Sequence, residues 1–151
     1  MASRFGLEIR AADAADAPGV AELMLAAGLP GSAAAITARL DRLKADRATV
    51  LLAVEWGPPS GIIVFHPRHT LLADLPTAFV GALLVSPDAR RRGIGRLLLK
   101  AASQAARSAG CGDLVLSAVA EDPSLQAFAE ATGFSAAESS FVRPLRKQRP
   151  S

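Results

Sequence analysis

The sequence predicts an α/β or α+β fold built around a mixed sheet, rather than a helical bundle or a β-sandwich. Segments with strand and helix patterns alternate along the chain, and the links between them are short. Half of the 151 residues are apolar, which is enough for a substantial core. The length falls in the ordinary range of one compact domain. We therefore expect a single domain over residues 1–151, with residues 146–151 as a flexible basic tail.

The first elements are one strand and one helix. Leu7–Ala11 has the pattern of a strand. A helix is expected to begin after Asp13 or Asp16 and to end at Gly28, because aspartate favours helix starts and glycine favours helix ends. The apolar positions of this helix are Val20, Leu23 and Met24.

A second helix and a hairpin follow. The helix is expected to begin after Ser32, and its apolar positions fall on one face. These positions are Ile36, Leu40 and Leu43. Thr49–Glu55 and Gly61–His66 are predicted strands, and the turn residues Gly57–Ser60 between them indicate that they pair as a hairpin.

The middle of the chain carries the clearest patterns. Ala78–Val85 is almost wholly apolar, which predicts a strand buried on both faces in the middle of the sheet. Ile94–Ala109 is the strongest predicted helix, and Gly110 is expected to end it. Its apolar residues recur at intervals of three and four: Ile94, Leu97, Leu98, Ala101, Ala105 and Ala109.

The last third predicts two more strands around a short helix. Leu114–Val119 has the composition of a buried strand. Asp122 and Pro123 match the N-cap and the first position of a helix that ends at Gly133. Phe141–Leu145 is expected to form the final strand.

Composition excludes several classes of protein. Cys111 is the only cysteine, so an internal disulfide and a cysteine-based zinc site are both impossible, and we expect no metal site. Its expected role is that of a packed small residue rather than a nucleophile. No window approaches the ~18 apolar residues of a membrane span, and Met1–Arg10 lacks the pattern of a signal peptide. We expect a cytoplasmic protein with no membrane partner.

The net charge of +3 arises mainly from two arginine-rich clusters. The C-terminal cluster lies in a segment without interleaved aromatic residues, so we expect a solubilising tail and no nucleic-acid partner. The other cluster belongs to Arg90-Arg91-Arg92-Gly93-Ile94-Gly95, a basic turn that opens directly into the strongest helix. Free N–H groups at a helix start attract phosphate, and glycines let it approach the backbone. This segment predicts a phosphate-bearing ligand.

Two familiar phosphate loops are excluded. The chain has no Gly-Lys pair, which a nucleoside-triphosphatase loop requires. The third glycine of the dinucleotide fingerprint is replaced by Leu98. Neither ATP nor NAD is therefore favoured as the ligand.

The run from Leu83 to Leu98 resembles the acetyl-CoA-binding motif of the GNAT N-acetyltransferases, Arg/Gln-x-x-Gly-x-Gly/Ala after an apolar strand. Downstream, Leu116–Val119, Ala127-Phe128 and Gly133-Phe134 resemble the segments that complete the cofactor groove. The resemblance implies the GNAT fold, with a central, mostly antiparallel sheet flanked by helices. It also implies an acyltransferase that uses acetyl-CoA as cosubstrate.

The resemblance carries over a set of cofactor-binding residues. In that family the pantetheine pairs with the strand backbone, and the pyrophosphate lies on the amides of the loop that follows. The implied residues are Leu83, Leu84 and Val85 on the strand and Arg90, Arg91, Arg92, Gly93, Ile94, Gly95 and Arg96 in the loop and helix start.

Two proton-transfer groups common in the family are missing here. Many relatives have a tyrosine four residues before the Gly-Phe pair, as the acid that protonates the CoA thiolate. This position is Ala129, and the chain contains no tyrosine. Many relatives also have a glutamate on the strand before the loop, whereas no carboxylate lies between Asp74 and Asp88. The general acid and base are therefore left unassigned.

Three residues remain as weak catalytic candidates. His66 and His69 lie at the end of a predicted strand, near where the family's substrate cleft opens, and histidine can accept an amine proton. Ser117 is expected in mid-strand beside the thioester. For all three, a purely structural role stays open. Glu121 and Asp122 can attract a cationic amine, although Asp122 also fits a helix cap.

The expected reaction is direct acetyl transfer to a primary amine, most simply that of a small molecule, without a covalent enzyme intermediate. The thioester is expected beside Val85, whose N–H would stabilise the oxyanion. The alternative is a CoA-binding protein that has lost catalysis and acts as a sensor or structural partner. Nucleic-acid binding by the basic tail is a third interpretation, and a homodimer is left open.

Overall fold

The computed structural model describes residues 6–89, 93–117, 123–135 and 143–146. The chain divides into two compact units, Met1–Ser117 and Ala118–Ser151, and each is described by itself. The strands of the first unit are β1 (Glu8–Ala11), β2 (Thr49–Val54), β3 (Gly61–Arg68), β4 (Thr77–Val85) and β5 (Asp113–Leu116). Its helices are α1 (Ala17–Ala26), α2 (Ala33–Ala45) and α3 (Ile94–Ser108), with 3₁₀ turns η1 (Ala14–Asp16) and η2 (Pro87–Ala89). The second unit contains α4 (Pro123–Ala131).

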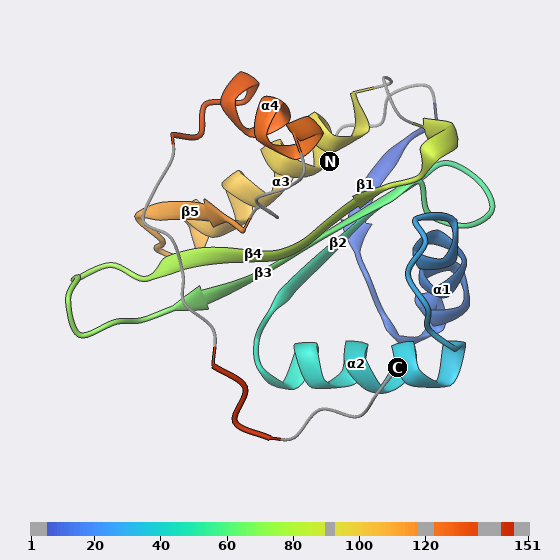
Figure 1. Cartoon of the computed structure of the whole chain (residues 1–151), viewed down its shortest axis with the longest axis horizontal. Helices are drawn as coiled ribbons and strands as arrows, with labels where there is room; N and C mark the ends of the chain where they lie inside the picture. Colours follow the sequence, from blue (N-terminus) through green and yellow to red (C-terminus); the bar gives the residue numbers. More distant parts are fainter. Residues whose placement is uncertain (1–5, 90–92, 118–122, 136–142, 147–151) are drawn as a thin grey trace. The chain divides into compact units, whose positions relative to one another are not determined.

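The five strands form one mixed sheet in the order β1-β2-β3-β4-β5 (Figure 1). The pairs from β1 to β4 are antiparallel, and β5 lies parallel to β4. The predicted mixed, mostly antiparallel sheet with flanking helices is therefore confirmed. The predicted hairpin of β2 and β3 is also present, with Ala53 opposite Gly61 beside the turn.

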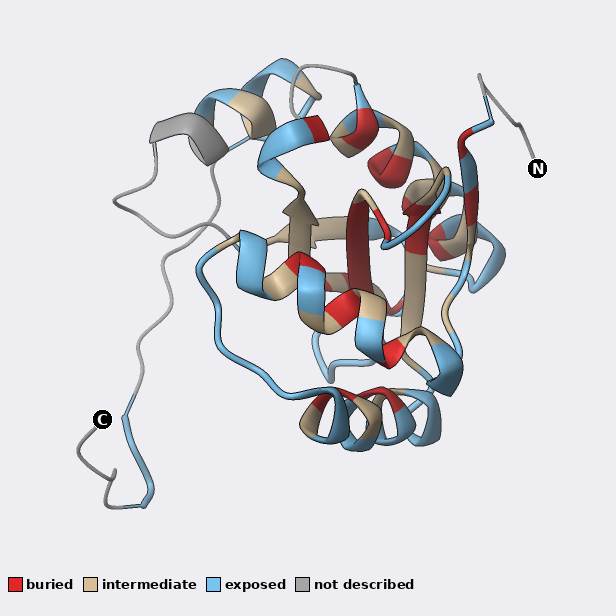
Figure 2. Ribbon diagram, turned by 90° about the vertical axis from the view of Figure 1, so that its right-hand side faces the viewer, coloured by how far each residue is buried: buried red, intermediate tan, exposed pale blue. Residues whose placement is uncertain are grey.

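Helices cover both faces of this sheet (Figure 1). On one face, buried residues of α1 and α2 form a cluster with Leu52, Ile62 and Val64. The intervening residue Ile63 faces the other side, because side chains alternate along a strand. There α3 packs so closely that a Cβ atom at Gly61 would lie 3.1 Å from Ile94 Cγ2. Figure 2 shows the buried residues gathered on the strands and on the helix faces turned toward them.

Local capping explains where the first helices begin. The Asp13 carboxylate accepts a hydrogen bond from the Ala15 N–H at 2.9 Å, and the 3₁₀ turn η1 starts there. Helix α1 then begins after Asp16, so both predicted starts are used. The Ser32 hydroxyl accepts a hydrogen bond from the Ala35 N–H at 3.1 Å and caps α2 as predicted. None of the helices in the described segments is both long and apolar enough to cross a membrane.

The structure corrects the expected burial of two elements. In β4, Ala78 and Val80 are buried, but Gly81 is exposed and the last four residues are half-buried. The buried face of α3 consists of Ile94, Leu98, Leu99, Ala102 and Ala106. Of the residues predicted for this face, Leu97, Ala101 and Ala105 are half-buried and Ala109 is exposed. In a helix so rich in alanine, periodicity alone does not select which alanines meet the sheet.

Several predicted boundaries also move. Strand β3 continues to Arg68, and β5 ends at Leu116, so Ser117 lies after the strand rather than in its middle. Helix α4 begins at Pro123 as predicted, whereas Asp122 lies outside the described residues. For the expected final strand, residues 141–142 also lie outside them, and Arg143–Leu145 form no strand.

Candidate functional site

Strands β4 and β5 pair over only part of their length. The paired residues run from Thr77, opposite Asp113, to Val80, opposite Leu116. Strand β4 then continues to Val85, but in the described part of the sheet no strand pairs with this half of β4 on its β5 side. The backbone of residues 81–85 therefore presents an open edge. An open edge is a template for an extended ligand that carries amide groups.

A β-bulge marks the point where the two strands part. Val64 lies opposite Ala82 and Phe65 lies opposite Val80, so Gly81 is an extra residue without a partner on β3. Gly81 is exposed and has open space where a Cβ would be. Gly81 was not among the site residues predicted from the sequence. A glycine inside an otherwise apolar strand was the available signal.

The hydrogen-bond pattern shows which backbone groups reach the open edge. The Ser86 N–H donates to the Ser60 carbonyl at 2.8 Å, on the β3 side. Because direction alternates along a strand, Leu84 also directs its N–H and C=O toward β3. Leu83 and Val85 direct theirs away from β3, into the open edge. Of the three strand residues predicted to bind the cofactor, two therefore offer backbone groups that no described strand pairs with there.

The start of α3 provides a second set of backbone donors. Gly93 adopts φ 76°, in the left-handed region that favours glycine, and no side chain caps the helix. The first helical hydrogen bond joins the Leu97 N–H to the Gly93 carbonyl at 3.0 Å. The N–H groups of Ile94, Gly95 and Arg96 therefore have no acceptor within the helix. Of the other predicted loop residues, Arg90, Arg91 and Arg92 lie outside the described residues.

The open edge and the helix start lie at the same end of the sheet. Val85 is opposite Gly61 on β3, and Gly61 lies directly beneath Ile94, the first residue of α3. Ile94 is 1% exposed, so the first turn of the helix is anchored in the core. A ligand with a phosphate group at one end and an amide-containing arm fits these two features. Acetyl-CoA has both parts, so the described residues fit the cosubstrate implied by the sequence.

The structure separates the two histidines. His66 lies within β3 opposite Phe79 and is half-buried, whereas His69 follows the end of the strand and is exposed. Ser117 is exposed directly after β5. Ala129 lies on α4 in the second unit, and Glu121 lies outside the described residues, as does Asp122.

Cys111 is placed far from the open edge. It precedes β5, and the next residue, Gly112, donates its N–H to the Pro76 carbonyl at the beginning of β4. Val85 is at the other end of that strand. Burial raises the pKa of the Cys111 thiol and disfavours the nucleophilic thiolate.

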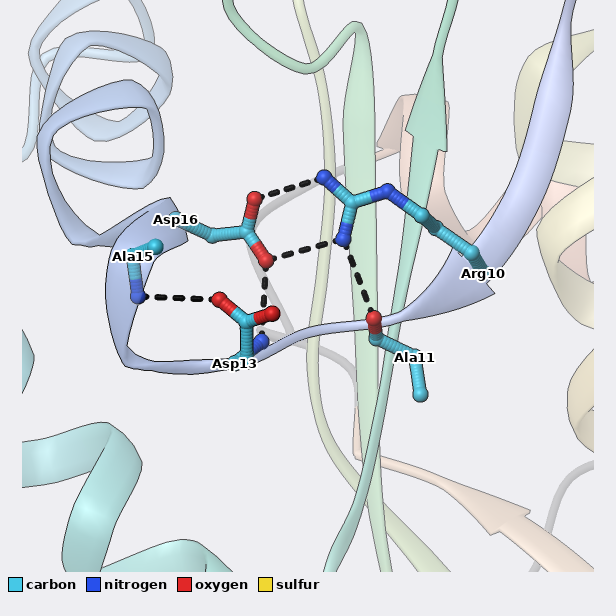
Figure 3. A network of polar contacts seen from close by, with 5 residues as sticks. All are labelled: Arg10, Ala11, Asp13, Ala15 and Asp16. Carbon is cyan, nitrogen blue, oxygen red and sulfur yellow. Dashed lines mark hydrogen bonds and ion pairs between the residues drawn. The ribbon is translucent and has the colours of Figure 1, made fainter.

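A pocket of about 360 Å³ lies elsewhere, beside β1 and the N-terminal half of α1. Arg10 and Asp16 line it and form a bidentate ion pair with N–O distances of 2.6 and 2.9 Å (Figure 3). The hydrogen bond from Arg10 lowers the pKa of the Asp16 carboxyl. No residue of β4, β5 or α3 lines this pocket. We therefore treat the ion pair as a structural element.

Comparisons with known proteins support the family that the sequence resembles. Residues 19–134 match the family model described as the acetyltransferase (GNAT) family. None of the curated proteins compared with the chain matches it. Among solved structures, a candidate acetyltransferase from Agrobacterium tumefaciens str. C58 has 27% identity and a TM-score of 0.80, and the alignment covers 91% of this chain and 99% of that one.

Two further structures share the fold at lower identity. The ribosomal-protein-alanine N-acetyltransferase of Brucella melitensis biovar Abortus 2308 has 23% identity and a TM-score of 0.75, with 92% of this chain and 99% of that chain covered. AAC(6')-Iy, in complex with the bisubstrate analogue CoA-S-monomethyl-acetylneamine, has 21% identity and a TM-score of 0.79, with 93% and 99% covered.

Proposed function

The chain belongs to the acetyltransferase (GNAT) family, whose members use acetyl-CoA as cosubstrate, and we propose that it transfers the acetyl group to a primary amine by direct attack. The observation that carries this proposal is the open edge of β4 at the end of the sheet where α3 begins. The open edge offers free amide groups to a pantetheine arm, and the first turn of α3 offers N–H groups to a diphosphate.

In this proposal the two features hold different parts of acetyl-CoA. The backbone groups of Val85 and the carbonyl of Leu83 pair with the pantetheine. The amides of Gly93, Ile94, Gly95 and Arg96 hold the diphosphate, together with Arg90, Arg91 and Arg92. Leu84 contributes through its side chain, which packs against the α1 and α2 cluster, rather than through its backbone.

We place the thioester nearer to Gly81 than to Val85, the residue beside which the sequence led us to expect it. Val85 is at the same end of the sheet as the diphosphate site, and the pantetheine arm separates the diphosphate from the sulfur. An arm that follows the open edge therefore brings the thioester toward the bulge, two to four residues along β4. There the free N–H of Leu83 is a suitable donor for the developing oxyanion.

A direct attack fits the chain better than a covalent intermediate. Cys111 is the only cysteine, and it lies near the opposite end of β4 with a raised thiol pKa. A neutral amine attacks the thioester carbonyl, the carbon–sulfur bond breaks, and CoA leaves as the thiolate. Only about 0.1% of an alkyl amine with a pKa near 10.4 is neutral at pH 7.4, equivalent to ~4 kcal/mol, so the reaction needs a proton acceptor.

The names of two similar structures support an amine acceptor. AAC(6')-Iy binds an analogue that joins CoA to an acetylneamine, and the Brucella protein is named for acetylation of a ribosomal-protein alanine. These acceptors differ in size, but each presents an amine. Direct attack on a primary amine is therefore the reaction that we propose for this chain.

The test combines calorimetric titration of CoA with a thiol-release assay. Acetyl-CoA is supplied with alkyl amines, amino acids, aminoglycosides and peptides with free N-termini. We expect CoA to bind and at least one amine class to release free CoA thiol in step with acetylated product. CoA binding without turnover on any amine favours the alternative, a CoA-binding sensor that has lost catalysis, which the missing glutamate and Ala129 suggest.

A further inference from the structure

A row of three side chains crosses the sheet just before β4 and β5 part. His66 on β3 lies opposite Phe79 on β4, and Phe79 lies opposite Val115 on β5. Directly opposed residues in a sheet point to the same face. Phe79 precedes the unpaired Gly81 by two residues, or about 7 Å along the strand. His66 thus lies on the strand next to β4, level with a residue that comes two positions before Gly81 at the start of the open edge.

This row faces the side of the sheet that carries α1 and α2. Ile62, Val64 and His66 alternate with Ile63 and Phe65 along β3, and the first two belong to the cluster with α1 and α2. Buried contacts cover Val64, whereas His66 is half-buried and Arg68 is exposed. The imidazole therefore lies at the margin of the core, where it can exchange protons with solvent.

The contact between Arg68 and Phe79 supports the same orientation independently. The Arg68 guanidinium lies 4.1 Å from the centroid of the Phe79 ring. Arg68 is two residues beyond His66 on β3, so both side chains point to the face that Phe79 occupies. The stacked guanidinium covers part of the ring and holds it in place. Several side chains of β3, β4 and β5 point to this face. Among those of the described residues that can accept a proton, His66 lies nearest to Gly81.

We infer that His66 accepts the proton of the acceptor amine, directly or through one water molecule. This inference rests on the proposed function. A proton moves from the ammonium nitrogen of the acceptor to the imidazole, and the freed lone pair forms the new nitrogen–carbon bond. The carbon–sulfur bond breaks with its electron pair remaining on sulfur. The second nitrogen proton passes through water to the thiolate, and His66 returns its proton to solvent.

The experiment uses the only two histidines of the chain as a matched pair. His66→Gln and His69→Gln are compared with the unmodified chain, using an alkyl amine that supports thiol release and an aromatic amine that is already neutral at pH 7. We expect His66→Gln to lower kcat/KM for the alkyl amine by about 10²-fold, a typical loss for a general base. His69→Gln should leave it within about twofold, and CoA affinity should be unchanged in both variants.

Two further readouts separate proton transfer from a folding effect. His66→Gln should lower the rate with the aromatic amine by less than about threefold, because that amine needs no deprotonation before attack. His66→Gly should recover activity toward the alkyl amine when imidazole is added, while His69→Gly should not respond.

Each contrary result has a distinct meaning. Equal losses with both amines would overturn the inference, because a structural defect does not depend on the protonation of the acceptor. Full activity of His66→Gln with the alkyl amine would overturn it while leaving the proposed acetyl transfer intact. Failure of the unmodified chain to acetylate any amine, despite CoA binding, would overturn the proposed function and this inference together.

Discussion

Gly61 of β3 and Leu98 of α3 lie so close together that a Cβ atom at Gly61 would be 2.9 Å from Leu98 Cδ1. Leu98 is fully buried, and the same Cβ would be 3.0 Å from the Leu84 carbonyl oxygen. We predict that Gly61→Ala lowers the free energy of unfolding by about 1–3 kcal/mol, the usual cost of an overpacked core. Denaturant unfolding measures this change.

Gly81→Ala is the matched control for this prediction. Gly81 is also a strand glycine, but no atom lies within 4 Å of its Cβ position. Its free energy of unfolding should be equal to or higher than that of the unmodified chain, because alanine restricts the unfolded state. If both variants unfold at the same denaturant concentration, α3 does not pack on Gly61 as described.

Gly93→Glu should abolish CoA binding. The substitution places an anionic side chain beside the free N–H groups that start α3, where we propose that the diphosphate lies. Gly110→Glu is the control, because Gly110 also has positive φ, has open space at its Cβ position and follows the other end of the same helix. Both substitutions place a glutamate at a positive φ and should destabilise the backbone to a similar degree. Calorimetry should therefore find CoA affinity lost only in Gly93→Glu. Unchanged affinity in a folded Gly93→Glu variant would contradict the phosphate site.

Leu83→Pro and Leu84→Pro test which backbone groups of β4 are free. Proline removes an N–H, and strands tolerate this loss where the N–H is not part of the ladder. Leu83→Pro should therefore weaken CoA binding with a smaller loss of stability. Leu84→Pro removes a hydrogen bond to β3 and should lower the free energy of unfolding by at least about 1 kcal/mol more. If Leu83→Pro unfolds at a lower temperature than Leu84→Pro, the backbone directions assigned to these two residues of β4 are wrong.

Ala129→Tyr introduces the hydroxyl that the family resemblance implies for this position. We predict that kcat changes by less than about threefold, because a thiolate with a pKa near ~8.5 leaves readily whereas neutralising the amine costs ~4 kcal/mol. Ala129→Phe controls for the bulk of the ring. A rise toward ~10²-fold in the tyrosine variant alone would place the rate limit on thiolate departure instead.

The Arg10–Asp16 ion pair should make stability depend on pH. Hydrogen bonding to Arg10 lowers the folded-state pKa of Asp16 from its ordinary value of 3.8, so the stabilisation is fully present above that value. It is lost as the pH falls through the lowered folded-state pKa. Asp16→Asn should therefore be less stable than the unmodified chain by about 1 kcal/mol at neutral pH. Urea unfolding from pH 7 to pH 2 should show this difference shrinking, and a constant difference would contradict the coupling.

Local sequence chemistry was sufficient to predict most elements. Asp13 and Ser32 mark helix starts because their side chains bond N–H groups two or three residues ahead. Gly93 favours a left-handed conformation that needs no distant partner. The motif from Arg90 to Gly95 identified the family for the same reason, since a phosphate site at a helix start is built from consecutive residues.

Pairing between strands decided the rest. The bulge at Gly81 exists because Val64 and Phe65 align with Ala82 and Val80, and the open edge exists because β5 stops at Leu116. The residue pattern alone determines neither how β3 and β4 align nor where β5 ends. For this reason β4 was predicted to be buried on both faces.

The same reasoning applies to the two histidines, because the local sequence pattern does not distinguish them. The sequence by itself determined the fold class and the family, and it predicted a phosphate loop, because the patterns that carry them lie in neighbouring residues. Only the tertiary structure distinguished His66 from His69, since it alone shows that β3 continues to Arg68 and aligns His66 with Phe79. Which side chains share a face near the open edge depends on hydrogen bonds between residues far apart in the chain.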